Sequence, residues 1–238
     1  MSDNYFTRSF DLIPTTKLSS PILIFGVGSI GSYTALALAK AGFSNLTLLD
    51  HDTVDYENIG PQFYSPDQIE QSKTMALADN LDKFIGADDS QESPFFALTQ
   101  KFTYDYTTDF LELSKLVTPE TVVICAIDSM KARTHLFHLL KELPYKGYID
   151  SRMAIESLDL YAFNRTNVKT QGHYAKTLFT DESAIQAPCT NKAISYTSLI
   201  AGGVIAKLVK DIILDKLTTY SVKMDITSMS TDILEIKE

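Results

Sequence analysis

Short apolar runs alternate with helix-like patterns along the first half of the chain. The runs PILIFG (21–26) and NLTLLD (45–50) predict buried strands, and the apolar spacing over 29–42 between them predicts a helix. A second helical pattern covers 71–84, and TVVICAID (121–128) is a continuous β-branched run typical of the middle of a parallel sheet. This alternation predicts an α/β fold built on a Rossmann-like, doubly wound and mostly parallel sheet.

The second half of the chain continues the alternation and then changes it. FFALTQKF (95–102) fits a strand, 129–143 an amphipathic helix and KGYID (146–150) a short strand. SLDLYAFNR (157–165) alternates apolar and polar residues, and the stretch 219–238 has the pattern of two strands around a polar turn. We therefore expect an antiparallel C-terminal extension of the sheet.

Periodicity is lost between these two groups of predicted strands, over 166–188. In a compact domain a loop longer than about 15 residues is usually functional or mobile. We therefore expect a flexible crossover loop over about 166–190, with Cys189 at its end. The stretch 193–214 that follows is apolar around much of its circumference, which predicts a helix that is buried or faces a partner.

Composition narrows the class of protein. The 238 residues, 45% of them hydrophobic, suffice for a sizeable core and favour a single domain over 1–238. The net charge of −9 includes no basic cluster, which argues against nucleic acid as the primary substrate. We find neither an apolar stretch of about 20 residues nor an N-terminal signal core, and expect a cytoplasmic protein that does not enter the membrane. Because Cys125 and Cys189 are the two cysteines, we expect neither a disulfide framework nor a zinc site.

A glycine-rich loop follows the first predicted strand. IFGVGSIGS places Gly26, Gly28 and Gly31 in a G-x-G-x-x-G pattern, whose glycines serve a tight turn, approach of a phosphate to the backbone, and packing of helix on strand. Asp50 ends the second strand, where a carboxylate would accept hydrogen bonds from ribose hydroxyls. On these residues alone, NAD and ATP fit equally well.

The next stretch, DHDTVDYENIGPQFYSPDQIEQSK, carries an acidic D-x-D-x-V pattern, then an asparagine, a glutamine and a helix-borne lysine. These positions are Asp50, Asp52, Val54, Asn58, Gln62 and Lys73. In VVICAIDSMKAR an apolar strand ends in Asp128 and is followed by Arg133. A looser similarity reaches APCTNKA, which includes Cys189. Over most of 21–210 the chain thus resembles the ThiF/MoeB/HesA family, the bacterial relatives of ubiquitin-activating E1 enzymes.

The resemblance implies that a carboxylate attacks the α-phosphorus of ATP, so that cations must meet the charge on the leaving pyrophosphate. Lys73 is the candidate cation, and the alternative is a solvated helix residue. Asp128 would hold Mg²⁺, cap the following helix, or do both. Asn58 and Gln62 would contact the nucleotide or order their loop, and Arg133 would reach a phosphate or lie on its helix surface.

The chain departs from the family at Pro61, where relatives have an arginine that clamps the triphosphate. We expect Arg152, at the end of a short strand, to replace that cation in catalysis. Arg8, in a tail that could cross to another subunit, is the alternative. If neither arginine serves, adenylation would be weak or absent.

Cys189 stands between a long loop and the start of an apolar helix, a setting that lowers the pKa of a thiol. It would receive the activated acyl group as a thioester or acyl-disulfide, or it is an ordinary small residue of the helix. Cys125, inside a predicted strand, is expected to serve packing.

The resulting interpretation is an E1-like adenylyltransferase that uses ATP and Mg²⁺ to activate the C-terminal carboxylate of a small ubiquitin-like or sulfur-carrier protein ending in Gly-Gly. The resemblance also implies a homodimer. One alternative is an NAD-dependent oxidoreductase, which leaves Lys73 unexplained. The other is a catalytically inactive E1-like subunit that binds nucleotide, which Pro61 favours.

Overall fold

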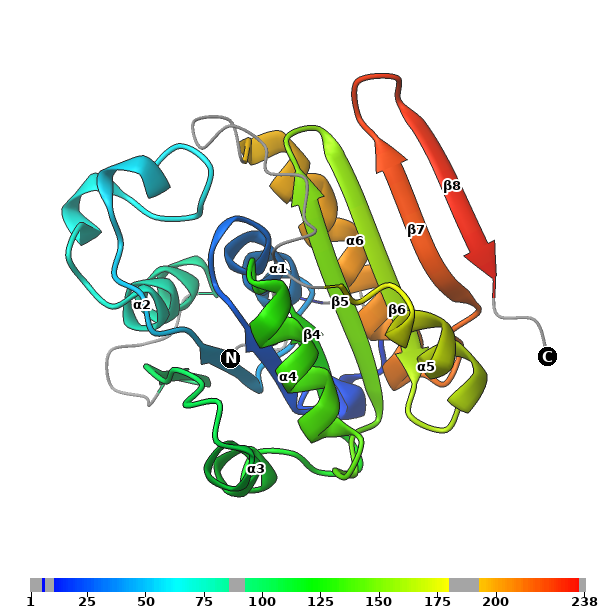
Figure 1. Ribbon diagram of the computed structural model, residues 1–238. Helices are drawn as coiled ribbons and strands as arrows, with labels where there is room; N and C mark the ends of the chain where they lie inside the picture. The colour runs from blue at the N-terminus through cyan, green and yellow to red at the C-terminus, as the bar shows by residue number, and fades with distance from the viewer. Residues whose placement is uncertain (1–5, 7–10, 86–92, 180–192, 236–238) are drawn as a thin grey trace.

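One sheet organises the chain in a computed structural model that describes residue 6 and residues 11–85, 93–179 and 193–235 (Figure 1). Its spatial order is β3 (Phe95–Leu98), β2 (Leu46–Leu49), β1 (Ile22–Phe25), β4 (Val122–Cys125), β5 (Gly147–Ala154), β6 (Ser157–Asn164), β7 (Thr219–Asp225) and β8 (Ser230–Glu235). Neighbours from β3 to β5 are parallel, and those from β5 to β8 are antiparallel. The predicted doubly wound, mostly parallel sheet with an antiparallel extension is confirmed.

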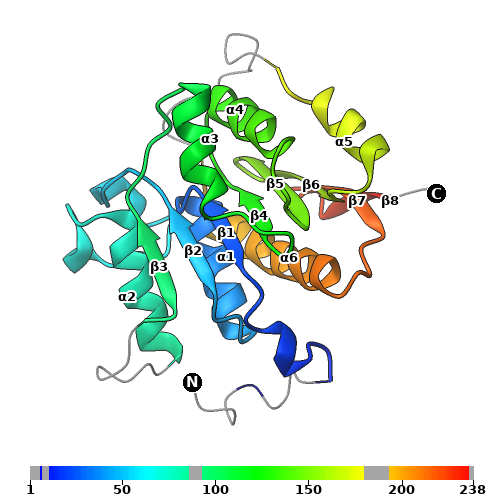
Figure 2. The same cartoon turned by 90° about the horizontal axis from the view of Figure 1, so that it is seen from below.

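Helices cover both faces of the sheet (Figure 2). One layer contains α1 (Ser29–Lys40), α2 (Lys73–Ile85) and α6 (Ser195–Ile213), and the other contains α3 (Tyr106–Ser114), α4 (Met130–Leu140) and α5 (Val168–Ala175). Short 3-10 turns lie at η3 (Thr15–Lys17), η4 (Tyr56–Asn58) and η5 (Pro66–Gln68). Alternate strand residues supply two apolar clusters, one under each layer. In the part of the chain that the structure describes, no helix has the length and apolar character needed to cross a membrane.

Two helices differ from the expectations. The sequence pattern did not reveal α3, whose first turn is capped by Asp105 through a 2.8 Å hydrogen bond from the Thr108 amide. The expected loop over 166–190 is wrong in its first part, because α5 occupies 168–175; residues 180–190 of that loop, with Cys189, lie outside the described residues.

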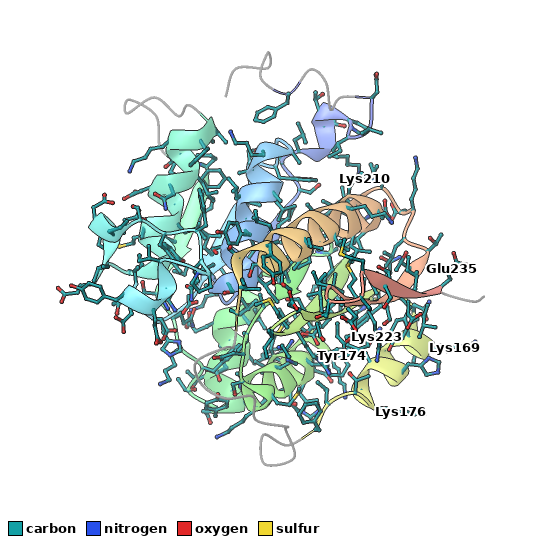
Figure 3. The ribbon with its side chains drawn as sticks, turned by 90° about the horizontal axis from the view of Figure 1, so that it is seen from above. Lys169, Tyr174, Lys176, Lys210, Lys223 and Glu235 are labelled. Atoms are coloured by element: carbon teal, nitrogen blue, oxygen red, sulfur yellow. The ribbon has the colours of Figure 1, made fainter. Side chains whose placement is uncertain are left out.

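α5 forms because of a cap and an aromatic anchor rather than a long periodic pattern. Asn167 accepts a 3.0 Å hydrogen bond from the Thr170 amide at the first turn. Tyr174 is fully buried, with its ring 4.9 Å from that of Phe137 and 5.4 Å from that of Tyr148. Figure 3 shows Tyr174 on the inner side of this helix. With eight residues, α5 is shorter than the window in which helical periodicity can be recognised.

The parallel strands end at a common edge, here called the carboxyl edge. Leu49, Phe25, Cys125 and Asp150 lie side by side on β2, β1, β4 and β5. The residues that follow Leu49, Phe25 and Cys125 enter neighbouring loops, as ligand sites of open α/β sheets require, whereas β5 continues past Asp150 to Ala154.

Candidate functional site

The glycine loop runs from β1 into α1 at the carboxyl edge. Gly26 has φ +84°, and a Cβ there would lie 2.7 Å from the Ala126 carbonyl oxygen. A Cβ at Gly31 would lie 1.9 Å from the Gly26 oxygen, so helix and strand approach too closely for a side chain. At Gly28 the nearest atom to an added Cβ is Gln62 Nε2 at 3.9 Å, which leaves room for a ligand beside the backbone.

Asp50 fastens this loop to the end of β2. Its Oδ2 accepts a 2.8 Å hydrogen bond from the Val27 amide, and its Oδ1 accepts a 3.0 Å bond from the Asp52 amide. A carboxylate has capacity for further bonds, so these contacts leave the predicted ribose interaction chemically open. Asp50, His51 and Asp52 also place ligand-type atoms within 4.8 Å of one another, the single group of this kind in the described ranges.

Lys73 begins α2, and its ammonium lies 3.0 Å from Asp52 Oδ2. The Lys73 side chain is 8% exposed, whereas that of Asp52 is 52% exposed. The hydroxyl of Tyr64 donates toward two carbonyls, Val27 at 2.7 Å and Lys73 at 3.2 Å, and so ties the glycine loop to the start of α2. Burial, followed by the charges of Asp50 and Asp52, raises the pKa of Tyr64 well above its ordinary value, so the hydroxyl stays a donor.

Sequence reasoning missed Tyr64. The available signal was a tyrosine inside a polar stretch just before the lysine-bearing helix, but the spacing does not reveal which carbonyls it reaches. The amide of the neighbouring Phe63 donates a 3.0 Å hydrogen bond to Ser32 Oγ, which holds the stretch against α1.

The stretch from Asn58 to Gln62 covers the first turn of α1. Asn58 Oδ1 accepts a 3.0 Å hydrogen bond from the Asp55 amide, so Asn58 orders its turn, one of the two expected roles. The Pro61 carbonyl accepts a 3.1 Å bond from Ser29 Oγ. Gln62 Oε1 is buried without a hydrogen-bond partner among the described residues. An unpaired buried acceptor beside Gly28 is consistent with a polar ligand at this position.

Asp128 lies between β4 and α4. The alternative that it caps α4 is wrong, because Ser129 is the cap and its hydroxyl accepts a 3.2 Å hydrogen bond from the Ala132 amide. The Asp128 side chain is exposed, and within the described ranges its carboxylate has no ion-pair or hydrogen-bond partner. It is therefore available to a cation.

Two of the three arginines considered for phosphate binding, Arg133 and Arg152, pair with Asp150. Arg133 is 3% exposed, so the expectation that it lies on the helix surface is wrong, and its contact with a phosphate stays a prediction. Arg152 Nε lies 2.8 Å from Asp150 Oδ2, and its Nη1 and Nη2 each donate at 2.9 Å to the carbonyl and hydroxyl oxygens of Thr177. Contact with a phosphate would require Arg152 to leave these partners.

Cys125 is fully buried in β4, which confirms its packing role. Cys189 and Arg8 lie outside the described residues. Their expected roles therefore stay predictions.

The glycine loop, the Asp52–Lys73 pair and Asp128 stand at the carboxyl edge of a doubly wound sheet, which defines an α/β protein of the Rossmann-like class. A sequence model of the ThiF family matches residues 15–238. The chain belongs to the ThiF family.

Named relatives match part of the chain. Ubiquitin-like modifier-activating enzyme 5 of Dictyostelium discoideum is 34% identical over 132 residues, covering 55% of this chain and 34% of that enzyme. The catalytic subunit of the NEDD8-activating enzyme E1 of Schizosaccharomyces pombe is 31% identical over 119 residues, covering 50% of this chain and 24% of that subunit. The chain thus aligns with about a third or less of the length of these relatives.

Among solved structures, E. coli MccB with succinimide has a TM-score of 0.74 at 16% identity, covering 98% of this chain and 72% of MccB. MccB with ATP has a TM-score of 0.70 at 16% identity, covering 100% of this chain and 73% of MccB. At this identity the likeness shows a shared fold.

Proposed function

We propose that the chain is an E1-like adenylyltransferase that uses ATP and Mg²⁺ to activate the C-terminal carboxylate of a small ubiquitin-like or sulfur-carrier protein. The observation that carries the proposal is the link through Tyr64, which holds the Lys73 backbone against Val27 in the glycine loop. Pyrophosphate leaving from ATP gives an ammonium at Lys73 a developing negative charge to stabilise, whereas hydride transfer to NAD does not.

In the proposed reaction a carboxylate oxygen attacks the α-phosphorus, a new O–P bond forms, and the bond from that phosphorus to the bridging oxygen breaks. The glycine loop would hold the phosphates at Gly28 and the N-terminus of α1. Gln62 Oε1 would accept a hydrogen bond from the bound nucleotide or its water. Arg152 belongs to the same site in this proposal, and its bonds to Asp150 and Thr177 support an indirect role.

The charges around the loop support a requirement for Mg²⁺. Asp50, Asp52 and Asp128 are three carboxylates that follow β2 and β4 at the carboxyl edge, and the ammonium of Lys73 pairs with one of them, Asp52. A polyanionic triphosphate is therefore expected to bind with a divalent cation, and the exposed carboxylate of Asp128 is of the oxygen type that Mg²⁺ prefers. When bound, Mg²⁺ would offset the charge of the phosphates.

The relatives support the class of substrate. One eukaryotic relative is named as an enzyme that activates a ubiquitin-like modifier, and the other as the catalytic subunit of an enzyme that activates NEDD8. MccB has been solved with ATP and, separately, with the nucleotide analogue AMPCPP and MccA. Activation of a protein or peptide terminus therefore fits both groups.

A second step and a dimer form part of the same proposal. The Cys189 thiolate would attack the acyl carbon of the adenylate, form a thioester and release AMP. Cys189→Ala should retain adenylate formation and lose any thiol-sensitive conjugate, and a conjugate that persists in this variant would exclude the thiol.

The proposed homodimer concerns a different surface. On α6, Tyr196 and Leu199 are 41% and 51% exposed, which supports a self-association surface.

The first test compares ligands by thermal shift. ATP with Mg²⁺ should raise the melting temperature, while NADH, or ATP with EDTA, should not, because only a ligand of the folded state stabilises it. A shift with NADH and none with ATP would favour the oxidoreductase instead. ATP–pyrophosphate exchange with peptides ending in Gly-Gly then separates an active enzyme from a subunit that binds nucleotide without turnover.

A further inference from the structure

A fully buried carboxylate, that of Asp150 in the middle of β5, stands between the two arginines. Asp150 Oδ1 pairs with Arg133 Nη1, and Asp150 Oδ2 pairs with Arg152 Nε at 2.8 Å. The side chains of Arg133 and Arg152 are 3% and 16% exposed, so the cluster lies inside the fold. Two guanidinium groups and one carboxylate leave it with one positive charge in excess.

Each arginine also donates hydrogen bonds to a different loop. Arg133 Nη2 donates to the carbonyl of Ile127, the residue immediately before Asp128. Arg152 donates to Thr177 twice, to the carbonyl and to the hydroxyl, both at 2.9 Å. One continuous set of bonds therefore runs from the Asp128 loop through Asp150 to the chain just after α5.

We propose that Arg152 is a positioning residue, which acts through Asp150 and Arg133 to couple the backbone at Thr177 to the backbone at Ile127 and so fixes Asp128 at the carboxyl edge. This inference deepens the proposed function and rests on it for the role of Asp128. It replaces direct contact between Arg152 and the triphosphate by an effect on the loop that carries the metal-binding carboxylate.

The geometry favours a fixed arrangement over a mobile cation. A guanidinium is a planar fork whose donors are pre-oriented, and Arg152 uses all three of its nitrogens within the chain. Its guanidinium carbon also lies 4.9 Å from the centre of the Tyr161 ring and 5.7 Å from that of Tyr174. Releasing one partner would leave a buried charge unpaired, which costs more than the bond itself.

Hydrogen–deuterium exchange of the ligand-free protein tests the coupling directly. Thr177→Val keeps the shape of the side chain and removes the hydroxyl, which accepts from Arg152 and donates locally to the Tyr174 carbonyl. We expect amides over 174–179 and over 126–130 to exchange faster together, on the order of fivefold for a bond worth about 1 kcal/mol. Lys176→Gln, an exposed change beside Thr177 at the C-terminal end of α5, should alter neither peptide (Figure 3). Faster exchange at 174–179 alone would overturn the proposal.

The metal requirement distinguishes positioning from a direct clamp. In Arg152→Gln, the Mg²⁺ concentration that gives half of the thermal shift with ATP should rise on the order of 10-fold, because Asp128 is then held less firmly for the metal. Saturating Mg²⁺ should restore the full thermal shift. Arg152→Lys should behave like the glutamine variant, because one ammonium cannot bond Asp150 and both Thr177 oxygens. If Arg152→Lys has the wild-type Mg²⁺ requirement, or if Arg152→Gln shows no thermal shift with ATP at any Mg²⁺ concentration, Arg152 contacts the triphosphate directly and our proposal is wrong.

The two experiments, hydrogen–deuterium exchange and the Mg²⁺ titration of the thermal shift, also separate this inference from the proposed function. If ATP with Mg²⁺ gives the wild-type protein no thermal shift, the adenylyltransferase assignment fails. The exchange measurement on the ligand-free protein still decides whether Thr177 and Ile127 are coupled.

Discussion

Two sets of ion pairs at the carboxyl edge differ in how their carboxylates meet solvent. Lys73 pairs with Asp52, which is 52% exposed, while Arg133 and Arg152 share Asp150, which is fully buried. A ligand anion can compete for the ammonium of Lys73 because the carboxylate it leaves behind can be hydrated. The arginines cannot be released without leaving a buried charge unpaired. A cation near a site is available to a ligand only where its counter-ion can afterwards be solvated.

The comparison is tested most strongly by removing each carboxylate charge. Asp150→Asn should destabilise the fold by about 3–5 kcal/mol because two guanidinium groups then lack their buried partner. Asp52→Asn is the comparison: it leaves one ammonium, that of the 8% exposed Lys73, without its carboxylate, and it should lower the unfolding free energy by less, about 1–2 kcal/mol. Urea unfolding measures both, and equal effects would contradict the distinction.

Lys73→Met should slow ATP–pyrophosphate exchange on the order of 100-fold, since the charge on the leaving group loses its ammonium. The melting temperature should change little, because Asp52 remains half-exposed. Lys83→Met, an exposed change on the same helix, should leave exchange at the wild-type rate. An exchange rate of Lys73→Met within a factor of two of the wild type would remove Lys73 from the mechanism.

Asp109 is a buried carboxylate of a different kind, held by hydrogen bonds rather than arginines. Burial alone would raise its pKa, but bonds from Thr103, His135 and the Tyr104 amide lower it below the ordinary value. The contribution of the ionised Asp109 to the free energy of unfolding is therefore complete above the ordinary Asp pKa of about 4. It is lost as the pH falls through the lowered pKa of the folded protein. Asp109→Asn should cost about 2 kcal/mol at pH 7 and less at pH 3, as measured by urea unfolding. A cost that grows toward pH 3 would contradict the sign.

Gly28→Ala should weaken ATP binding by about 10-fold, because the added methyl group enters the space beside the backbone where a phosphate is expected. Gly60→Ala is the control, since a Cβ there has no neighbour within 4 Å. Isothermal titration with ATP and Mg²⁺ compares the two, and equal affinities would place the phosphates elsewhere.

Tyr64→Phe removes the hydroxyl that bridges Val27 and Lys73 and keeps the ring. We expect a loss of about 1 kcal/mol, seen as a roughly fivefold higher KM for ATP, because the two loops are no longer held together. Tyr56→Phe, on an exposed side chain of η4, should leave KM unchanged. An unchanged KM in Tyr64→Phe would show that the bridge does not position Lys73.

Much of the fold was predictable because its signals are local and periodic. The apolar run at Val122–Cys125 is typical of a buried strand, and the spacing before Ile85 is typical of a helix with one buried face. The short helix α5 could not be predicted, since its formation depends on Tyr174 meeting aromatic rings from β5 and α4. Local propensity is a weak guide when a distant contact supplies most of the stabilisation.

The sequence by itself determined the glycine loop, the mostly parallel order of the sheet and the place of Lys73 at the start of a helix, because spacing along the chain sets turns, periodicity and caps. Only the tertiary structure decided which cation pairs with a solvent-exposed carboxylate and which cations are fixed by a buried one. Asp150 binds one arginine from α4 and one from its own strand, and the latter reaches Thr177, 25 residues further along the chain. No local pattern encodes such a partnership, because it depends on which carboxylate folding buries.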